Sequence, residues 1–244
     1  MSMERNNEEM NIGQPGDMTA ELLSAYVSGL NDKQIEQFIN YYNVLIERNR
    51  VMNLTRITSP IEAAQKHFAD SILGAELLPE NARVIDVGTG AGFPGIPLKI
   101  VRPDIELVLL DSLAKRIGFL EEACAKIGIG ARAIHARAED AARSDGLRAH
   151  FDAALSRAVA PMNLLLELTV PFLKVGGRSL MYKGAGAAEE IAACPNACRE
   201  LCCSLTTRDY DVPWGERTIV IAEKLSKTPS RYPRKAGVPQ KKPL

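Results

Sequence analysis

The sequence predicts an α/β fold built on a mostly parallel sheet. The first observation is residues 83–111, which read as a strand, a glycine-rich loop, a helix and a second strand that ends in an acid. The second is that short runs rich in Val, Ile and Leu alternate with amphipathic helical patterns over most of the remaining chain. Alternating strands and helices are typical of parallel sheets, whose strands are buried on both faces. The 244 residues suffice for one domain with short extensions.

The composition is that of a soluble globular protein, with 46% hydrophobic and 25% charged residues. The formal net charge is zero, so the total charge indicates neither an acidic nor a basic partner. No apolar run has the length of a transmembrane helix, and the polar N-terminus does not resemble a signal peptide. We therefore expect a cytoplasmic protein that does not bind a membrane.

The first 80 residues are expected to precede the sheet. Residues 1–16 have no periodic apolar face, and we expect them to be disordered. Residues 17–80 are expected to form a helical cap, with one helix capped by Asp17 and a longer one that begins at Asn31 or Asp32.

A further helix is expected from about Pro60, and it carries His67. A histidine on such a helix is more often a structural partner than a catalyst. Asp70, three residues later, lies at the spacing that would let it hold the imidazole.

The glycine-rich loop and the second strand predict a nucleoside site. Glycines allow the main chain to turn sharply and to approach a ligand closely. Asp111 ends the second strand, where a carboxylate can accept hydrogen bonds from both hydroxyls of a ribose. The loop glycines are Gly88, Gly90, Gly92 and Gly95.

Two cofactor classes fit this plan. A dinucleotide fingerprint, G-x-G-x-x-G/A, counted from Gly88 puts Phe93 at its last position, and the match from Gly90 begins late and contains Pro94. The pattern Asp86-x-Gly-x-Gly-x-Gly instead resembles the first motif of class I S-adenosylmethionine (SAM) methyltransferases. SAM is therefore favoured over NAD(P), which stays as an alternative together with a glycine turn that binds nothing.

The remaining elements predict a seven-stranded sheet with an antiparallel edge. This is the Rossmann-like architecture of class I SAM-dependent methyltransferases, here with an N-terminal helical extension and a core over 81–225. The expected helices are 113–127, 161–172 and 187–203, and the expected later strands are 131–135, 151–155, 177–182, 205–210 and 218–222. The last two strands form a hairpin through a Pro-Trp-Gly turn.

Four of the five cysteines lie close together near the end of the core. Steps of four residues place Cys194, Cys198 and Cys202 on one face of the expected helix, with Cys203 next to them. A zinc site would usually take Cys pairs from separate elements. We therefore expect reduced, partly buried thiols, with no metal and no disulfide.

The carboxyl ends of the strands bring the candidate residues to one crevice. The fourth strand ends in Ser156-Arg157-Ala158 rather than in the Asn/Asp-Pro-Pro-aromatic turn of enzymes that methylate exocyclic amines. The only Cys-Pro step, at Cys194, lies too late for a cytosine C5 nucleophile. We expect an acceptor that is already nucleophilic, such as guanine N7, and an SN2 transfer aligned without a strong general base.

The last residues, 226–244, are basic. From Lys224 onward there are seven Lys or Arg residues and no acid. Such a tail is either a solvated flexible end or an arm that contacts phosphates, which gains affinity by releasing counterions. The step Arg231-Tyr-Pro-Arg234 would suit a base or a sugar.

Several ordered motifs together resemble one bacterial family, the small-subunit ribosomal RNA guanine-N7 methyltransferases, also called glucose-inhibited division protein B. The resemblance runs from about residue 20 to the end of the chain. It is carried by Asn53-Leu-Thr, His67-Phe-Ala-Asp-Ser, Asp86-Val-Gly-Thr-Gly-Ala-Gly-Phe-Pro-Gly, Leu110-Asp-Ser-Leu-x-Lys-Arg, Ser156-Arg-Ala, Tyr182-Lys-Gly and Arg231-Tyr-Pro-Arg-Lys-Ala-Gly.

The resemblance implies SAM-dependent methylation of guanine N7 in the 530 loop of 16S rRNA, near position 527. It implies that Asp111 holds the ribose of SAM and that Gly88, Gly90, Gly92, Phe93, Ala138, Glu139 and Arg157 contact SAM. Arg157 could equally serve an RNA phosphate, and Arg157 and Lys183 are the candidates for positioning the reactants.

The implied partner is 16S rRNA or the small ribosomal subunit, and we expect a monomer. The basic residues expected to contact RNA are Arg137, Lys183, Arg231, Arg234 and Lys235. Two other hypotheses stay open: an NAD(P)-dependent oxidoreductase, and a ribosome-assembly protein that binds RNA without catalysis.

Overall fold

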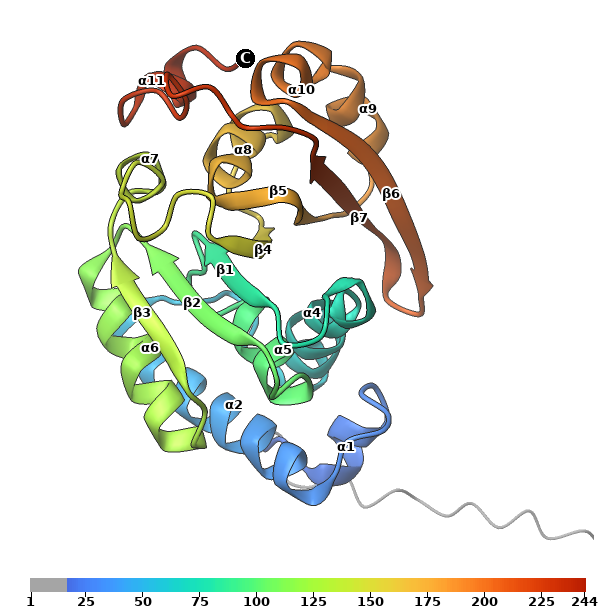
Figure 1. The fold of residues 1–244 in the computed structure, drawn as a ribbon. Coiled ribbons are helices and arrows are strands. Elements are labelled where there is room, and N and C mark those ends of the chain that lie inside the picture. The colour runs from blue at the N-terminus through green and yellow to red at the C-terminus, as the bar shows by residue number, and fades with distance from the viewer. Residues whose placement is uncertain (1–16) are drawn as a thin grey trace, which may run out of the picture.

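The computed structural model describes residues 17–244, so the expectation of disorder at 1–16 lies outside the described residues. Its centre is a seven-stranded sheet in the order β3-β2-β1-β4-β5-β7-β6 (Figure 1). The strands from β1 to β5 run parallel, and β7 is antiparallel to both β5 and β6. The predicted sheet and its hairpin are confirmed. The strands are β1 Arg83–Val87, β2 Glu106–Asp111, β3 Ala131–His135, β4 Phe151–Arg157, β5 Leu173–Lys183, β6 Cys203–Val212 and β7 Gly215–Lys224.

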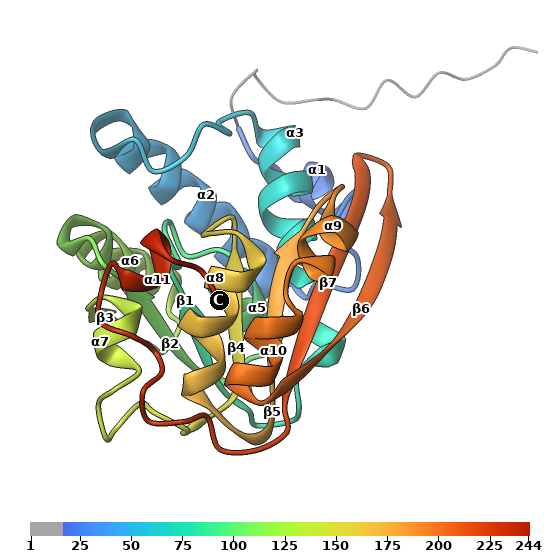
Figure 2. The ribbon, with the colours of Figure 1, turned by 90° about the horizontal axis from the view of Figure 1, so that it is seen from above.

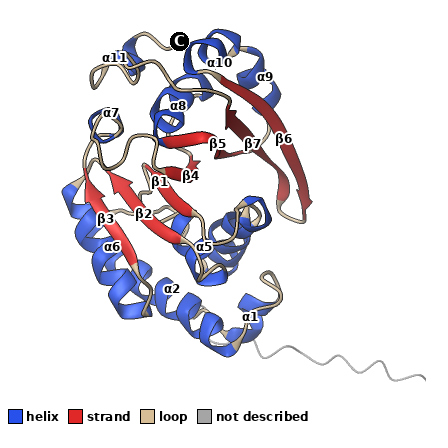
Figure 3. Ribbon diagram, viewed as in Figure 1, coloured by secondary structure: helices blue, strands red, loops and turns tan. Residues whose placement is uncertain are grey.

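Helices cover both faces of the sheet, as Figure 3 shows. On one face, α2 (Asp32–Met52) packs on α5 (Gly95–Val101) and α6 (Ala114–Ile127). The other face carries α7 (Ala138–Ala141) and α8 (Met162–Thr169), which continues as a 3₁₀ turn at Val170–Phe172. The two faces alternate along each strand, so that in β1 Val84 packs in one core and Ile85 in the other. The strand order reverses between β1 and β4, which opens a crevice at their carboxyl ends.

The N-terminal cap is helical, but its first helix is shorter than expected. The helix α1 covers only Ala20–Ser24, and its N-cap is Thr19, whose hydroxyl accepts a hydrogen bond from the Leu22 amide. Asn31 caps α2 and forms a reciprocal capping box with Gln34. The expectation that Asp17 is the cap is wrong, because Thr19 lies three residues before the amide that needs an acceptor.

The helix expected from Pro60 is interrupted. It begins as α3 (Pro60–Glu62), widens to a π-helical segment at Ala63–Ala69 and narrows again to α4 (Asp70–Ile72), before a 3₁₀ turn at Ala75–Leu77. A π turn inserts an extra residue and shifts which side chains share a face, and such turns are frequent at functional sites.

The cysteine-bearing helix is two helices, α9 (Ala187–Ala192) and α10 (Pro195–Leu201). Pro195 has no amide hydrogen to donate, so it starts a new helix instead of continuing the first. Cys194 precedes α10, and Cys202 follows it in a left-handed conformation. The expectation of three thiols on one helical face is therefore wrong. All five cysteines are free, and no cluster of three His, Cys, Asp or Glu within residues 17–244 is placed to hold a metal.

Residues 226–244, here called the C-terminal segment, pack on the core (Figure 2). Tyr232 is buried among side chains of α8 and β7. Arg234 donates to both oxygens of Glu167, a fully buried carboxylate on α8, at 2.6–3.2 Å. The segment ends in α11 (Val238–Lys241), which also contacts α8. Among the described helices none is long and apolar enough to cross a bilayer.

The Arg234–Glu167 pair predicts a large difference between two arginines of the C-terminal segment. Arg234→Ala leaves a buried carboxylate without its cation and should lower the free energy of unfolding by about 2 kcal/mol. The expected loss is smaller than for a fully buried pair, because the Arg234 side chain is partly exposed. Arg231 is 66% exposed in its pair with Glu200, so Arg231→Ala should leave the free energy of unfolding nearly unchanged. Urea unfolding of both variants tests this. Equal losses would show that the buried pair does not anchor the segment.

Candidate active site

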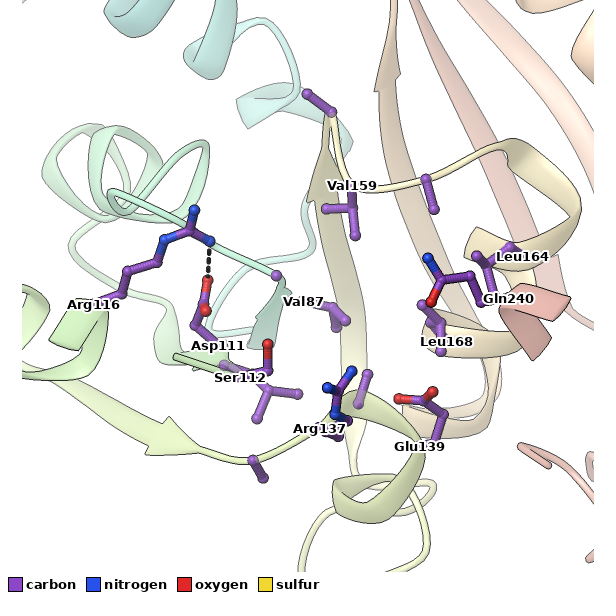
Figure 4. Close-up of a pocket in the computed structure, with 16 residues that line it drawn as sticks. Val87, Asp111, Ser112, Arg116, Arg137, Glu139, Val159, Leu164, Leu168 and Gln240 are labelled. Carbon is purple, nitrogen blue, oxygen red and sulfur yellow. Dashed lines mark hydrogen bonds and ion pairs between the residues drawn. The ribbon is translucent and has the colours of Figure 1, made fainter. Parts of the chain in front are cut away.

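A cavity of about 330 Å³ lies beyond the carboxyl ends of the first strands (Figure 4). Gly88 and Asp111 line it from the ends of β1 and β2. Ala138 and Glu139 line it from α7, and the neighbouring Arg137 points into the same space. Four of the residues predicted to hold the cofactor therefore meet at one cavity.

The glycine loop is held by a buried carboxylate. Asp86 is fully buried in β1, and its Oδ2 accepts hydrogen bonds from the Thr89 hydroxyl at 2.7 Å and the Gly95 amide at 2.9 Å. A Cβ on Gly95 would lie 2.8 Å from that oxygen, so only glycine fits there. Burial raises the pKa of Asp86 to about 6. These contacts fix the path of the loop.

Asp111 is oriented by three donors. Its Oδ2 accepts from the Gly90 amide at 3.0 Å and from Arg116 Nη1 at 3.1 Å, and its Oδ1 accepts from the Leu113 amide at 2.9 Å. A carboxylate has about four acceptor positions, so one remains for a ligand. Gly90 has a positive φ of 63°, which turns its amide towards the acid. Gly90 therefore orients the Asp111 carboxylate and does not itself line the cavity.

A second cavity, of about 360 Å³, lies beside the first. Arg157, Tyr182 and Lys183 line it from the ends of β4 and β5, and Asp70 and Arg217 line its other side. Ala158 lines both cavities. It has a φ of 54°, and a non-glycine residue in this left-handed conformation is typical of strained functional loops.

Arg157 is held at the second cavity by neutral acceptors. Its Nη1 donates to the Lys66 carbonyl at 2.9 Å and to the Ser71 hydroxyl at 3.2 Å, and its Nη2 lies 3.3 Å from His67 Nδ1. The guanidinium also lies 4.9 Å from the centre of the Phe93 ring. The π-helical segment supplies both Lys66 and His67. No carboxylate among the described residues forms an ion pair with Arg157, so its charge is free to attract an anion.

His67 is a neutral acceptor in this arrangement. Its pKa is lowered to about 3, first by burial and then by the charge of Arg157. Because a guanidinium can only donate, Nδ1 must accept, and Nε2 then donates to the Thr55 hydroxyl at 2.9 Å. The ring is stacked on Phe93 with centroids 4.3 Å apart. The sequence indicated that His67 is structural, and this geometry supports that interpretation. The sequence did not indicate its partners, Arg157 and Thr55.

The expected pairing of His67 with Asp70 is wrong. Asp70 instead accepts from Trp214 Nε1 at 2.6 Å and from Arg217 Nε at 2.9 Å, both from the hairpin. The π turn separates the two residues, and the hairpin donors lie more than 140 positions away in the sequence. No local signal could have found them.

The predicted site residues thus divide between two places. Gly88, Asp111, Ala138 and Glu139 line the first cavity, whereas Arg157 lines the second. Phe93 packs against Arg157 and His67, and Gly92 lies inside the loop, where an added Cβ would meet Tyr41 and Ile96.

Three of the basic residues expected to contact RNA are paired with carboxylates. Lys183 donates to Glu190 at 2.7 Å, and Arg231 and Arg234 are paired with Glu200 and Glu167. Arg137 and Lys235 are exposed.

Comparison with known proteins identifies the family. The family model for rRNA small subunit methyltransferase G matches residues 34–210. The chain belongs to this family. Relatives named ribosomal RNA small subunit methyltransferase G include one from Alkaliphilus oremlandii, 44% identical over 92% of this chain and 98% of the relative. Another, from Streptococcus agalactiae, is 44% identical over 88% of this chain and 93% of the relative.

Solved structures support the fold. A methyltransferase from Pyrococcus furiosus has a TM-score of 0.53 and 13% identity, and it covers 77% of this chain and 97% of its own. A SAM-dependent methyltransferase from Aquifex aeolicus has a TM-score of 0.51 and 16% identity, over 67% of this chain and 93% of its own. At such identities the likeness concerns the fold alone, and it confirms the class I methyltransferase architecture.

The depressed pKa of His67 predicts a pH dependence of stability. Below about pH 6.5 the imidazole of the unfolded chain gains a proton, whereas the folded protein does not bind it until about pH 3. The unfolded state is then favoured, so the stability that neutral His67 provides is lost as the pH falls. The loss should reach about 3 kcal/mol at pH 4. Urea unfolding from pH 7 to 4 should show a shallower pH dependence for His67→Gln than for the wild type. Parallel curves would contradict a neutral buried His67.

Proposed function

We propose that the protein transfers the methyl group of SAM to N7 of a guanine in the 530 loop of 16S rRNA, near position 527. The observation that carries this proposal is the pair of adjacent cavities joined at Ala158. Methyl transfer by SN2 needs a donor and an acceptor held in line, with the sulfonium methyl between them. Family membership supports the same activity.

SAM occupies the first cavity in this proposal. Asp111 accepts from one ribose hydroxyl through its remaining acceptor position, because three donors already fix the orientation of its carboxylate. Gly88 allows close approach of the nucleoside, since a Cβ there would lie 3.0 Å from a Val159 methyl and narrow the cavity. Gly90, Gly92 and Phe93 act by shaping the loop, and Ala138 and Glu139 contact the base. SAM supplies the electrophilic methyl group, and the residues of the chain orient it.

The target guanine occupies the second cavity. Enzymes that modify a base take it out of the stack and read its edges in a pocket. Guanine presents O6 as an acceptor beside N7, and N1–H and the 2-amino group as donors. Arg157 and Lys183 provide donors for O6 or for the adjoining phosphate, and Asp70 provides an acceptor for the opposite edge. N7 carries a free lone pair, so alignment suffices without a general base.

In this proposal the RNA also contacts basic residues outside the second cavity, of which Arg137 lines the first. Arg137, Arg231 and Lys235 are exposed and able to contact phosphates. Arg234 contributes by holding its segment against Glu167 and so positions Lys235. The protein acts as a monomer in the cytoplasm, and its partner is 16S rRNA or the small ribosomal subunit.

The test uses radiolabelled SAM and small-subunit particles from cells that lack this gene. The labelled 16S rRNA is then cleaved at N7-methylguanine with borohydride and aniline. We expect one new cleavage, in the 530 loop. Label at another base or atom would keep a methyltransferase but discard this target. SAM binding without any transfer would favour an RNA-binding assembly protein, and binding of NAD(P) instead of SAM would favour an oxidoreductase.

Two lysines on β5 provide a matched pair of variants. Lys183 and Lys174 lie at opposite ends of the strand, and each is paired with a carboxylate. Lys183→Gln should weaken RNA binding or lower kcat about tenfold and leave SAM affinity within about twofold, because one charge-assisted contact is worth about 1.5–3 kcal/mol. Lys174→Gln should change neither.

The reciprocal variant is Asp111→Asn, which should weaken SAM binding about tenfold and spare RNA binding. Calorimetry with SAM and filter binding with the 530-loop RNA measure the two affinities. If Lys183→Gln lowers both affinities equally, the assignment of Lys183 to the RNA side fails.

A further inference from the structure

The C-terminal segment forms part of the wall of the first cavity. Gln240, on α11, lines this cavity together with Glu139, Leu164 and Leu168 (Figure 4). The family model ends at residue 210, before this segment. The sequence predicted either a flexible end or a segment that contacts RNA phosphates, and neither prediction places a side chain beside the cofactor.

Gln240 is held there by anchors on both sides of the cavity. The Gly237 amide donates to Glu139 Oε1 at 3.0 Å, which ties the segment to α7. Arg234 pairs with Glu167 and ties it to α8. Arg143 Nη2 also donates to the Pro233 carbonyl. The position of Gln240 therefore follows from three contacts outside α11.

The direction in which SAM lies in the cavity follows from the chemistry of transfer, and this step rests on the proposed function. The ribose lies at Asp111, at the end of β2. The sulfonium methyl must face the second cavity, so it lies towards Ala158, which both cavities share. The adenine then lies at the opposite end, between Ala138 and the leucines of α8. Glu139 lies at that end, and Gln240 lies beside Leu164 and Leu168 (Figure 4).

The edge of adenine suits these two side chains. Its 6-amino group donates hydrogen bonds, and the neighbouring ring nitrogens accept them. A glutamine amide offers one acceptor and two donors in one plane, the arrangement that pairs with N6 and N7 of adenine. Glu139 Oε1 is occupied by the Gly237 amide, and its second oxygen can accept from the amine. Leu164 and Leu168 provide an apolar surface for the ring.

We propose that Gln240 is a specificity-determining residue that recognises the adenine edge of SAM, and that the C-terminal segment is thereby part of the cofactor site. The amide of Gln240 and the carboxylate of Glu139 select an amino group at position 6 of the purine and disfavour a carbonyl there.

The test compares S-adenosylhomocysteine with S-inosylhomocysteine, which has a carbonyl in place of the 6-amino group, by calorimetry on the full chain. The variant Gln240→Met keeps the side-chain volume and removes the amide. It should weaken binding of S-adenosylhomocysteine 5- to 10-fold and binding of S-inosylhomocysteine by only about two- to threefold, because the contact to N7 is lost with both ligands and the contact to the amine only with the first. The matched control is Lys241→Met, which changes the next, exposed side chain of α11 and should alter neither affinity.

The outcomes separate this inference from the proposed function. If Gln240→Met binds S-adenosylhomocysteine as tightly as the wild type does, or weakens both ligands equally, Gln240 does not read adenine, and methyl transfer by the wild type still supports the proposed function. If the wild type binds neither ligand, both proposals fail. Gln240 is exposed, so thermal unfolding of Gln240→Met should match the wild type and exclude misfolding as the cause of a loss.

Discussion

The buried carboxylate of Asp86 is the interaction on which the site depends. It accepts hydrogen bonds from the Gly95 amide and the Thr89 hydroxyl, and these two bonds fix both ends of the glycine loop. The fixed loop turns the Gly90 amide towards Asp111, and Asp111 is then aimed at the cavity. An ionised carboxylate without a cation partner is costly to bury, and the raised pKa of Asp86 records that cost. Its hydrogen bonds with the Thr89 hydroxyl and the Gly95 amide offset part of that cost.

A second set of contacts aligns the acceptor side with the donor side. Arg157 ends β4, and the next residue, Ala158, turns in a left-handed conformation between the two cavities. The π-helical segment holds Arg157 through a backbone carbonyl and a neutral histidine. Neutral acceptors fix the orientation of the guanidinium without cancelling its charge. The N-terminal cap therefore contributes directly to the site, although it lies before the sheet in the sequence.

The parts that could be predicted from the sequence are those set by local patterns. The seven strands, the glycine loop and the acid at Asp111 follow from short-range periodicity and spacing, and all are present, with β5, β6 and β7 longer than expected. The π turn did not follow, because tertiary contacts to Lys66 and His67 lie outside any local pattern. The break at Pro195 had a local signal, the proline itself, which the prediction of one continuous helix overlooked. The partners of Arg157, Asp70 and Arg234 lie 67 to 147 residues away, so no window of sequence contains them.

The two halves of the first cavity differ in how far apart along the chain their contacts lie. Gly90 and Asp111, which aim the ribose acid, are 21 residues apart, whereas Gly237 and Glu139 are separated by 98 residues. Closing the longer loop costs more chain entropy, and contacts of high sequence separation form slowly in folding. The contact that orients the ribose acid therefore lies within one βαβ unit. The other half of the cavity is lined by α7, α8 and the C-terminal segment, so it is complete only when these three elements are packed together.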